Sequence, residues 1–260
     1  MFSLSGKTAL ITGASGYLGS VMAEGMAKAG ATVYLNGRNN ENISAMVSKL
    51  VEKGLDVKSA VFDVTKRDEI EFFFDGFESE YLDIVVNNAY AGAAGTVETI
   101  SAEDYLLSYD VAMIATHNLV QIALPYLRSA QKKNGDASVI TIASMYGVVS
   151  PDLRIYASKE GANPPMYGAA KAALIQWTKY AACEFAEEGI RFNCISPGAF
   201  PSEGVQEANK PLVSKIINKI PMARVGVPKD IVGPLIFLAS SSSSYVTATN
   251  LMVDGGWTAW

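Results

Sequence analysis

The chain has 260 residues, of which 49% are hydrophobic and 18% charged, so it can bury a large core and its composition excludes intrinsic disorder. Its formal net charge is −5 and no run of Lys and Arg forms a basic stripe, which argues against nucleic acid as a partner. No apolar run reaches membrane-spanning length and the first residues lack the apolar stretch of a secretion signal, so we expect a cytoplasmic protein without membrane contact.

Strand-like apolar runs alternate with helical patterns along the whole chain, which predicts parallel strands joined by crossover helices. The expected strands lie near 7–12, 31–36, 57–62, 82–87, 137–143, 190–195 and 250–254. The expected helices lie near 18–29, 41–53, 67–79, 102–130, 166–187 and 228–239. Because such crossovers are right-handed, this order predicts one α/β domain over residues 1–260, a Rossmann-type doubly wound parallel sheet of about seven strands with helices on both faces.

Two segments, 145–165 and 199–226, interrupt this alternation. The first combines Gly, Pro and several charges and predicts a loop, whereas the second has Pro at both ends of a short amphipathic piece and indicates a mobile flap. Each follows the end of a strand, where a doubly wound sheet binds its ligands. We therefore expect both segments to be substrate loops.

A glycine-rich turn, Thr12–Gly19, follows the first expected strand and opens a helix. Glycines there permit a tight turn and close approach of the backbone to a pyrophosphate, and the helix N-terminus offers free N–H groups to phosphates. An ordinary turn is the alternative for this segment taken alone. The residues expected to contact a nucleotide in this turn are Gly13, Ser15, Gly16, Tyr17, Leu18 and Gly19.

The second expected strand ends at Arg38 without the carboxylate that would bind the ribose hydroxyls of NAD. A guanidinium is well shaped to bind a 2′-phosphate, so Arg38 predicts NADP as the cofactor, with NAD as the alternative. Asp63 and Val64, at the end of the third strand, are placed to cap the adenine. The alternative for Asp63 is the N-cap of the following helix.

Tyr167 and Lys171 are four residues apart, which places a phenol and an ammonium on the same face of the helix expected there. A nearby cation favours the tyrosinate and lowers the pKa of the phenol toward the range useful in acid–base catalysis. A surface pair without function is the alternative. Ser144, which ends an apolar strand at the same sheet edge, can bind a substrate oxygen or start a turn.

The cysteines and the histidine provide no metal site. Cys183 and Cys194 lie in apolar segments without Cys or His neighbours at metal-ligand spacing, so we expect buried, reduced thiols and no metal. His117, the only histidine, lies in an apolar helical stretch and is assigned to packing or to a subunit interface.

Taken together, these motifs resemble the short-chain dehydrogenase/reductase family along nearly the whole chain. The matching segments are Thr12–Gly19, Asp63-Val64, Asn87-Asn88-Ala89, Ser144, Tyr167 with Lys171, Asn193 with Pro197-Gly198, and Val253-Asp254-Gly255-Gly256. The resemblance implies that Tyr167 protonates a carbonyl oxygen, that Ser144 orients this oxygen and that Lys171 also binds the nicotinamide ribose. It further implies that Asn88, Ala89, Pro197 and Gly198 line the cofactor, and that the chain forms a homodimer or homotetramer through helices 102–130 and 166–187.

Three features depart from the family pattern. Tyr17 stands where compact members usually carry glycine, Ser144 and Tyr167 are separated by 22 residues, and Ala112 occupies the position where an Asn normally anchors a proton-relay water. The length and the Asp254–Gly256 ending still favour the compact branch. Within it, the stretch Met145–Pro151 resembles a subgroup associated with flagellin-glycan sugar modification and, more loosely, gluconate 5-dehydrogenases.

The expected function is therefore NADP(H)-dependent interconversion of a secondary alcohol and a ketone on a small polar substrate, a sugar or polyol derivative. A 3-oxoacyl-thioester reductase is one alternative, but the charges in the 145–165 segment are balanced in sign rather than basic. A catalytically weak nucleotide-binding regulator is the other, supported by Tyr17 and Ala112 and opposed by the presence of Ser144, Tyr167 and Lys171.

Overall fold

The computed structural model describes residues 2–260 and contains a parallel sheet of seven strands in the order β3-β2-β1-β4-β5-β6-β7. In chain order the strands are β1 Thr8–Ile11, β2 Thr32–Gly37, β3 Val57–Val61, β4 Ile84–Asn87, β5 Ala137–Ile142, β6 Ile190–Pro197 and β7 Asn250–Val253. This sheet confirms the Rossmann-type architecture. The chain runs outward from β1 to β3 and then outward again from β4 to β7, so the strand order reverses between β1 and β4, the point where such sheets bind ligands.

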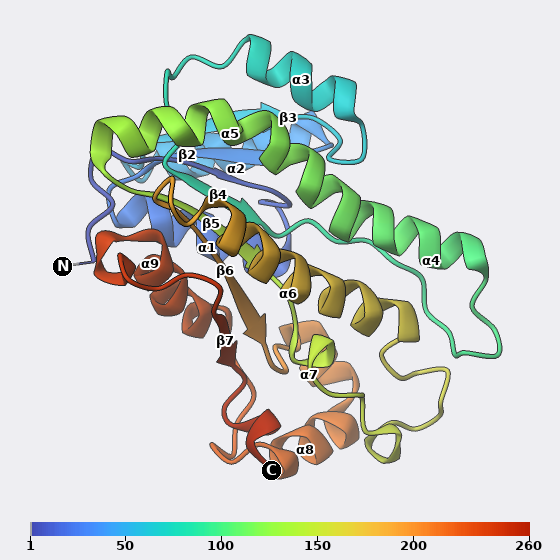
Figure 1. Cartoon of the computed structure of the whole chain (residues 1–260). Helices are drawn as coiled ribbons and strands as arrows, with labels where there is room; N and C mark the ends of the chain where they lie inside the picture. Colours follow the sequence, from blue (N-terminus) through green and yellow to red (C-terminus); the bar gives the residue numbers. More distant parts are fainter. Residues whose placement is uncertain (1) are drawn as a thin grey trace.

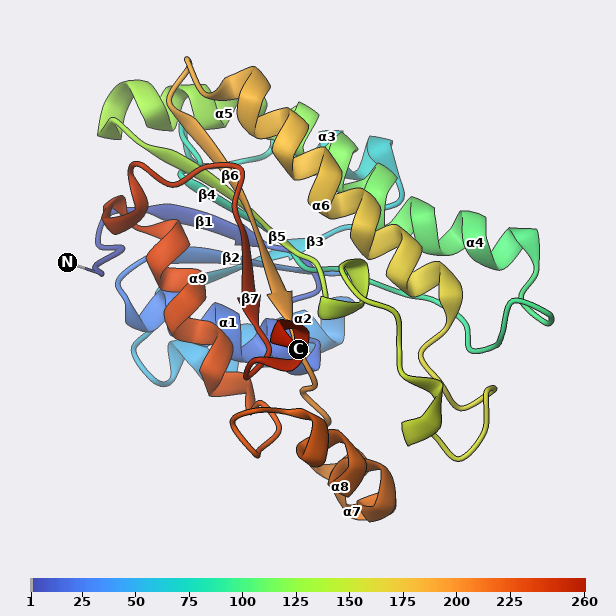
Figure 2. The same ribbon diagram turned by 60° about the horizontal axis from the view of Figure 1, so that its bottom comes forward.

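Helices cover both faces of the sheet (Figures 1 and 2). One face carries α1 Tyr17–Lys28, α2 Asn40–Val51 and α9 Val232–Ala239, and the other carries α3 Arg67–Asp75, α5 Ala115–Asn134 and α6 Pro165–Phe185. Alternate strand residues serve the two layers: Ile84 and Val86 pack with α1 and α9, whereas Val85 packs with α5. Strands buried on both faces must be apolar at nearly every position, which explains the continuous apolar runs of the sequence.

The helix expected at 102–130 is divided in two. α4 Ala102–Tyr109 and α5 are joined by a π-helical turn, Asp110–Ile114, which contains Ala112. The apolar pattern continues across this turn, so periodicity alone did not indicate it. π-Helical turns often occur at functional sites, and Val111 of this one lines a cavity at the carboxyl ends of β1, β2 and β3.

The segments 145–165 and 199–226 contain short helices that pack on each other beyond the carboxyl ends of β6 and β7 (Figure 2). In the first segment these are the 3-10 turns Met145–Gly147 and Leu153–Ile155, and in the second α7 Glu203–Ala208 and α8 Lys210–Lys219. Ile155 and Val213 belong to one apolar cluster, to which Trp257 of the C-terminal turn also belongs. Asp152 and Lys219 form an ion pair between the two segments.

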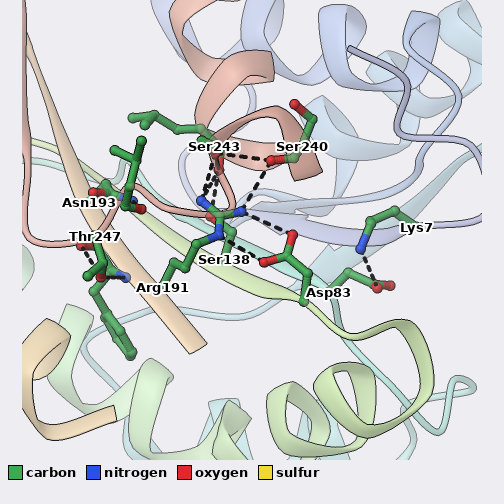
Figure 3. Close-up of polar contacts among 12 residues, drawn as sticks. Lys7, Asp83, Ser138, Arg191, Asn193, Ser240, Ser243 and Thr247 are labelled. Carbon is green, nitrogen blue, oxygen red and sulfur yellow. Dashed lines mark hydrogen bonds and ion pairs between the residues drawn. The ribbon is translucent and has the colours of Figure 1, made fainter. Parts of the chain in front are cut away.

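Buried polar groups stabilise the end of the sheet where the strands begin, opposite the carboxyl ends at which ligands bind (Figure 3). Arg191 donates to Asp136 at 2.8 Å and to the Ser243 hydroxyl at 2.7 Å, while Asp83 accepts the backbone N–H of Thr8 at 2.9 Å. Removing one partner of a buried pair leaves an uncompensated charge, which is strongly destabilising. Because these groups satisfy one another, we assign them to the stability of the fold.

One of the two cysteines and the single histidine lie on the surface. Cys183 is exposed on the outer face of α6, so the expectation of a buried thiol is wrong for it, whereas Cys194 in β6 is buried as expected. His117 is exposed on α5 and meets the edge of the Trp177 ring at 6.4 Å between centroids. No helix within residues 2–260 has the length and hydrophobicity that crossing a membrane requires.

Candidate active site

A cavity of about 400 Å³ lies at the carboxyl ends of β1, β2 and β3. It brings together the predicted nucleotide-contacting residues of the glycine turn and of the two neighbouring strand ends. These are Gly13, Ser15, Gly16, Tyr17, Leu18, Gly19, Arg38, Asp63, Val64, Asn88 and Ala89. At the floor of the cavity α1 begins after Gly16, which has no side chain to cap the helix, and the first turn contains no acidic residue. Its N–H groups are therefore suited to bind phosphate oxygens.

Two positions of the glycine turn require glycine, one because of its backbone conformation and the other because a side chain would clash. Gly13 has φ of +61°, and a Cβ added to Gly19 would lie 2.2 Å from the Gly13 carbonyl oxygen. The Asn88 side-chain amide donates to the carbonyl oxygens of Thr12 at 2.9 Å and Gly13 at 3.2 Å, which holds the turn in shape. A bare backbone cradle at a helix N-terminus fits the pyrophosphate of a dinucleotide.

The Tyr17 side chain lines this cavity and extends from it to contact the 199–226 segment. Its hydroxyl donates to the carbonyl oxygen of Pro201 at 3.3 Å. Burial and the nearby carboxylate of Glu203 raise the pKa of Tyr17, so the phenol remains a neutral donor at physiological pH. The departure from glycine therefore preserves the backbone at the start of α1 and adds a contact to the flap.

Arg38 follows β2 at the open side of the nucleotide cavity. Its side chain is 71% exposed, and Nη1 lies 3.8 Å from Oδ2 of Asp63. Asp63 accepts hydrogen bonds from the backbone N–H and the hydroxyl of Thr65 at 2.9 and 2.8 Å. Because α3 begins at Arg67 with Lys66 at its N-cap, the N-cap alternative for Asp63 is wrong.

A second cavity, of about 240 Å³, adjoins the first at the carboxyl ends of β5 and β6. The two share Leu18, Asn88 and Tyr90 as lining residues. Its other lining residues are Ile142, Ala143, Tyr167, Lys171, Pro197, Gly198 and Phe200. A ligand that extends from the first cavity into the second would therefore reach the tyrosine–lysine pair.

α6 positions Tyr167 and Lys171 one turn apart, with Lys171 Nζ 5.7 Å from the centre of the Tyr167 ring. The ammonium donates to the carbonyl oxygen of Ile142 at 2.7 Å. Ser144 follows β5, and its hydroxyl accepts the backbone N–H of Tyr146 at 3.1 Å. Gly168 permits the close approach of α6 to the 3-10 turn Met145–Gly147, because a Cβ there would lie 2.7 Å from the Tyr146 carbonyl oxygen.

Burial determines the protonation of this pair. It raises the pKa of Tyr167, an effect that the Ser144 hydroxyl partly offsets and Tyr90 reinforces. The expectation of a lowered pKa is therefore wrong in its net direction, because loss of hydration is the largest effect on this buried phenol. Burial also lowers the pKa of Lys171 to about 8. At neutral pH the phenol carries its proton and most of the lysine is charged.

The closing Asp-Gly-Gly motif supports the Pro197-Gly198 turn beside this cavity. A Cβ on Gly198 would lie 2.6 Å from the Cα of Asp254, so only glycine permits this packing. The Asp254 carboxylate accepts the backbone N–H groups of Gly256 and Thr258, each at 2.9 Å. These contacts explain why the last motif of the chain matters to a site more than 50 residues before it.

Two residues of the site carried no recognised signal in the sequence. Asn36 is buried in β2, where its amide donates to the carbonyl oxygens of Ala60 and Phe62, both at 3.0 Å, and so aligns the strand ends that frame the nucleotide cavity. Tyr90 follows Asn88-Ala89 and lies between both cavities. Its position after a cofactor-lining segment was the only available signal. Ala112, in the π-helical turn, is buried and offers no side-chain hydrogen bond to a water.

Comparisons with known proteins find similarity along nearly the whole chain. The family model described as enoyl-(acyl carrier protein) reductase matches residues 13–258. A tropinone reductase homolog from Arabidopsis thaliana is 32% identical over 262 residues, which cover 99% of this chain and 94% of the relative. A gluconate 5-dehydrogenase from Gluconobacter oxydans is 32% identical over 260 residues, covering 98% and 96%. The structure of a gluconate 5-dehydrogenase from Burkholderia cenocepacia, in complex with NADP and tartrate, superposes with a TM-score of 0.87 at 28% identity, covering 100% and 98%.

Proposed function

Because the chain belongs to the short-chain dehydrogenase/reductase family and is thus an NAD(P)-dependent oxidoreductase, we propose that it interconverts a secondary alcohol and a ketone on a small polar substrate, with NADP(H) as its cofactor. One observation carries this proposal. Tyr167 and Lys171 line a cavity that shares part of its lining with the nucleotide cavity, and the Ser144 side chain lies beside Tyr167 and interacts with its phenol.

The protein's own groups would handle the proton. In reduction, the O–H bond of Tyr167 breaks as its proton passes to the carbonyl oxygen, while the Ser144 hydroxyl donates to the same oxygen. The Lys171 ammonium stabilises the phenolate left behind. Lys171 uses one of its three N–H donors on Ile142, so two remain for the phenolate and for a ribose hydroxyl. The nicotinamide, when bound, contributes hydride chemistry at the carbonyl carbon.

The glycine turn and α1 would hold the pyrophosphate, Asp63 and Val64 the adenine, and Asn88 with Pro197-Gly198 the nicotinamide half. The proton-donor form of Tyr167 predominates at neutral pH because burial raises its pKa. This protonation state favours ketone reduction as the direction at that pH, and alcohol oxidation as pH rises.

We propose a sugar or polyol derivative as the substrate class. Similarity to a gluconate 5-dehydrogenase over 98% of the chain supports it. The test is to assay the purified protein with NADPH against a panel of keto-sugars, simple cyclic ketones and a 3-oxoacyl-thioester. Reduction of keto-sugars at the highest kcat/KM is expected, and a preference for simple ketones would contradict it.

A thioester reductase is a second candidate, favoured by the match to the family model described as enoyl-(acyl carrier protein) reductase. An acyl carrier would need a basic patch at the mouth of the site. Asp152 pairs with both Arg154 and Lys219, so its carboxylate offsets part of the positive charge that these two residues contribute. Reduction of the thioester alone in the same panel would establish this candidate instead.

For the cofactor, Arg38→Ala is expected to lower kcat/KM with NADPH by roughly tenfold to a hundredfold and to leave NADH use nearly unchanged. The guanidinium would form charge-assisted hydrogen bonds to a 2′-phosphate that NADH lacks. Steady-state kinetics with both cofactors measure the ratio, and Arg128→Ala, which changes an exposed arginine distant from the cavity, is the control. A ratio unmoved by Arg38→Ala would show that Arg38 does not recognise the 2′-phosphate.

We also propose a homodimer or homotetramer assembled through α4, α5 and α6. Large apolar side chains are exposed on this surface, among them Leu106, Leu107 and Tyr180, exposed by 70%, 51% and 69%. Light scattering at micromolar concentration should give a mass of two or four chains, and Tyr180→Glu should lower it. Phe72→Glu, on the exposed face of α3, should leave the mass unchanged. A monomer for the unaltered protein would reject this assembly.

A further inference from the structure

Tyr90 lies at the centre of the candidate active site, although no role was expected for it. The residue follows β4 and the Asn88-Ala89 pair, and it lines both the nucleotide cavity and the catalytic cavity. Its aromatic ring touches the two groups proposed to perform the chemistry. The edge-to-face contact with the Tyr167 ring has a centroid separation of 4.9 Å and an interplanar angle of 82°. Lys171 Nζ lies 5.2 Å from the centre of the Tyr90 ring.

The Tyr90 ring is itself held in place at its far end. Its hydroxyl forms a 2.9 Å hydrogen bond with the hydroxyl of Ser108, which is fully buried in α4. Ala112 and Ala170 belong to the apolar cluster against which the ring packs. A side chain anchored at both ends presents a fixed face to its neighbours.

Lys171 needs such a neighbour because it is a buried cation. The residue is 3% exposed, and it donates a hydrogen bond to a neutral acceptor, the carbonyl oxygen of Ile142. Among residues 2–260, no carboxylate forms an ion pair with it. A buried ammonium without an anionic partner tends to lose its proton, and the electron-rich face of an aromatic ring within about 6 Å offsets part of that loss.

We propose that Tyr90 is a positioning residue, whose ring keeps the Lys171 ammonium charged and in place while its edge contact fixes the ring of Tyr167. Packing against Ala112 and Ala170 sets the orientation of the Tyr90 ring, and the hydrogen bond to Ser108 adds to it. This inference rests on the proposed roles of Tyr167 and Lys171, and it adds to them a residue that acts through both.

Within the part of the chain that the structure describes, the titratable groups around Lys171 include no carboxylate, so the aromatic rings and the carbonyl oxygen of Ile142 support its charge. Tyr167 lies on the same helix, Tyr90 follows β4, and Cys194 faces Lys171 from β6. Burial raises the pKa of the Cys194 thiol to about 11, so it is neutral at working pH. Tyr146, which interacts with Tyr167, also has a pKa raised by burial and stays neutral.

The decisive experiment compares Tyr90→Phe, which keeps the ring, with Tyr90→Leu and Tyr90→Met, which remove it. The titration of Lys171 is followed by NMR in protein labelled with [ε-¹³C]lysine and free of cofactor, and the signal is assigned by its loss in Lys171→Met. Loss of the ring should lower the Lys171 midpoint by about one pH unit and reduce kcat by about threefold to thirtyfold. Tyr90→Phe should stay within about threefold of the unaltered enzyme.

Three outcomes would overturn the proposal. The first is a Lys171 midpoint unmoved in both ring-less variants, which would reduce Tyr90 to a packing residue. The second is equal damage from Tyr90→Phe and Tyr90→Leu, which would place the effect in the hydroxyl rather than the ring. The third is damage to kcat without a parallel shift of its pH profile. Because the NMR titration needs no substrate, it gives its answer even if the proposed reaction is not found.

Discussion

Replacement of Tyr167 with Phe is expected to lower kcat by about a thousandfold while changing the affinity for NADP(H) by less than about threefold. The phenyl ring would fill the same space and keep the edge contact with Tyr90, but it has no proton to give to a carbonyl oxygen. The loss should therefore fall on the chemical step rather than on cofactor binding. Steady-state kinetics and fluorescence titration with NADPH measure the two quantities separately.

A matched control for this substitution is Tyr126→Phe. Tyr126 also loses a hydroxyl that is hydrogen-bonded, in this case to the carbonyl oxygen of Phe74, but it lies on α5 away from both cavities. The control should keep nearly full activity. Retention of more than roughly a tenth of the activity in Tyr167→Phe would remove Tyr167 from the role of acid–base catalyst.

Lys171→Ala should damage two functions at once, with kcat lower by about a hundredfold and the Kd for NADP(H) higher by about tenfold. The first loss follows because the phenolate of Tyr167 would have no cation beside it. The second follows because a donor to the ribose hydroxyls would be missing. Lys179→Ala, which changes an exposed lysine on the same helix, is the matched control and should alter neither value.

The pH dependence of the unaltered enzyme gives an independent check on Lys171. Burial lowers the pKa of this lysine to about 8, so its charge is present below that pH and is lost as pH rises through it. The rate of ketone reduction should therefore fall across this range, and the step should be missing from the residual activity of Lys171→Ala. For the Lys171→Ala variant itself, an unchanged Kd for NADP(H) would argue against the contact between Lys171 and the ribose. The catalytic role of Lys171 would then be judged from kcat alone.

The fold was largely predictable because buried parallel strands and crossover helices leave strong periodic signals. The π-helical turn at Asp110–Ile114 was not, since it joins α4 and α5 without a non-helical residue and apolar residues occur on both sides of it. Cys183 shows a related weakness: an apolar stretch identified α6 as a helix, but not which of its faces turns outward. Patterns along the chain predict elements better than they predict orientation.

The candidate site was predictable where a motif places residues on one element. The spacing of Tyr167 and Lys171 placed them on the same helical face. The direction of the Tyr167 pKa shift was not predictable, because it depends on how much surrounding protein excludes water. Tyr90 was missed for a similar reason. Its contacts reach Ser108 and Lys171, which are distant in sequence, and nothing in its local sequence indicates them.

The packing of the 145–165 segment against the 199–226 segment has a consequence for protein engineering. Asp152 pairs with Lys219, and Ile155 and Val213 bury each other's surface within the cluster that includes Trp257. Grafting the first segment alone from a relative would leave a lysine without its counter-ion and an apolar surface open to water. A relative that serves as the source of a new substrate preference should therefore supply both segments and the C-terminal turn together. The glycine turn and the strands of this protein can be kept unchanged.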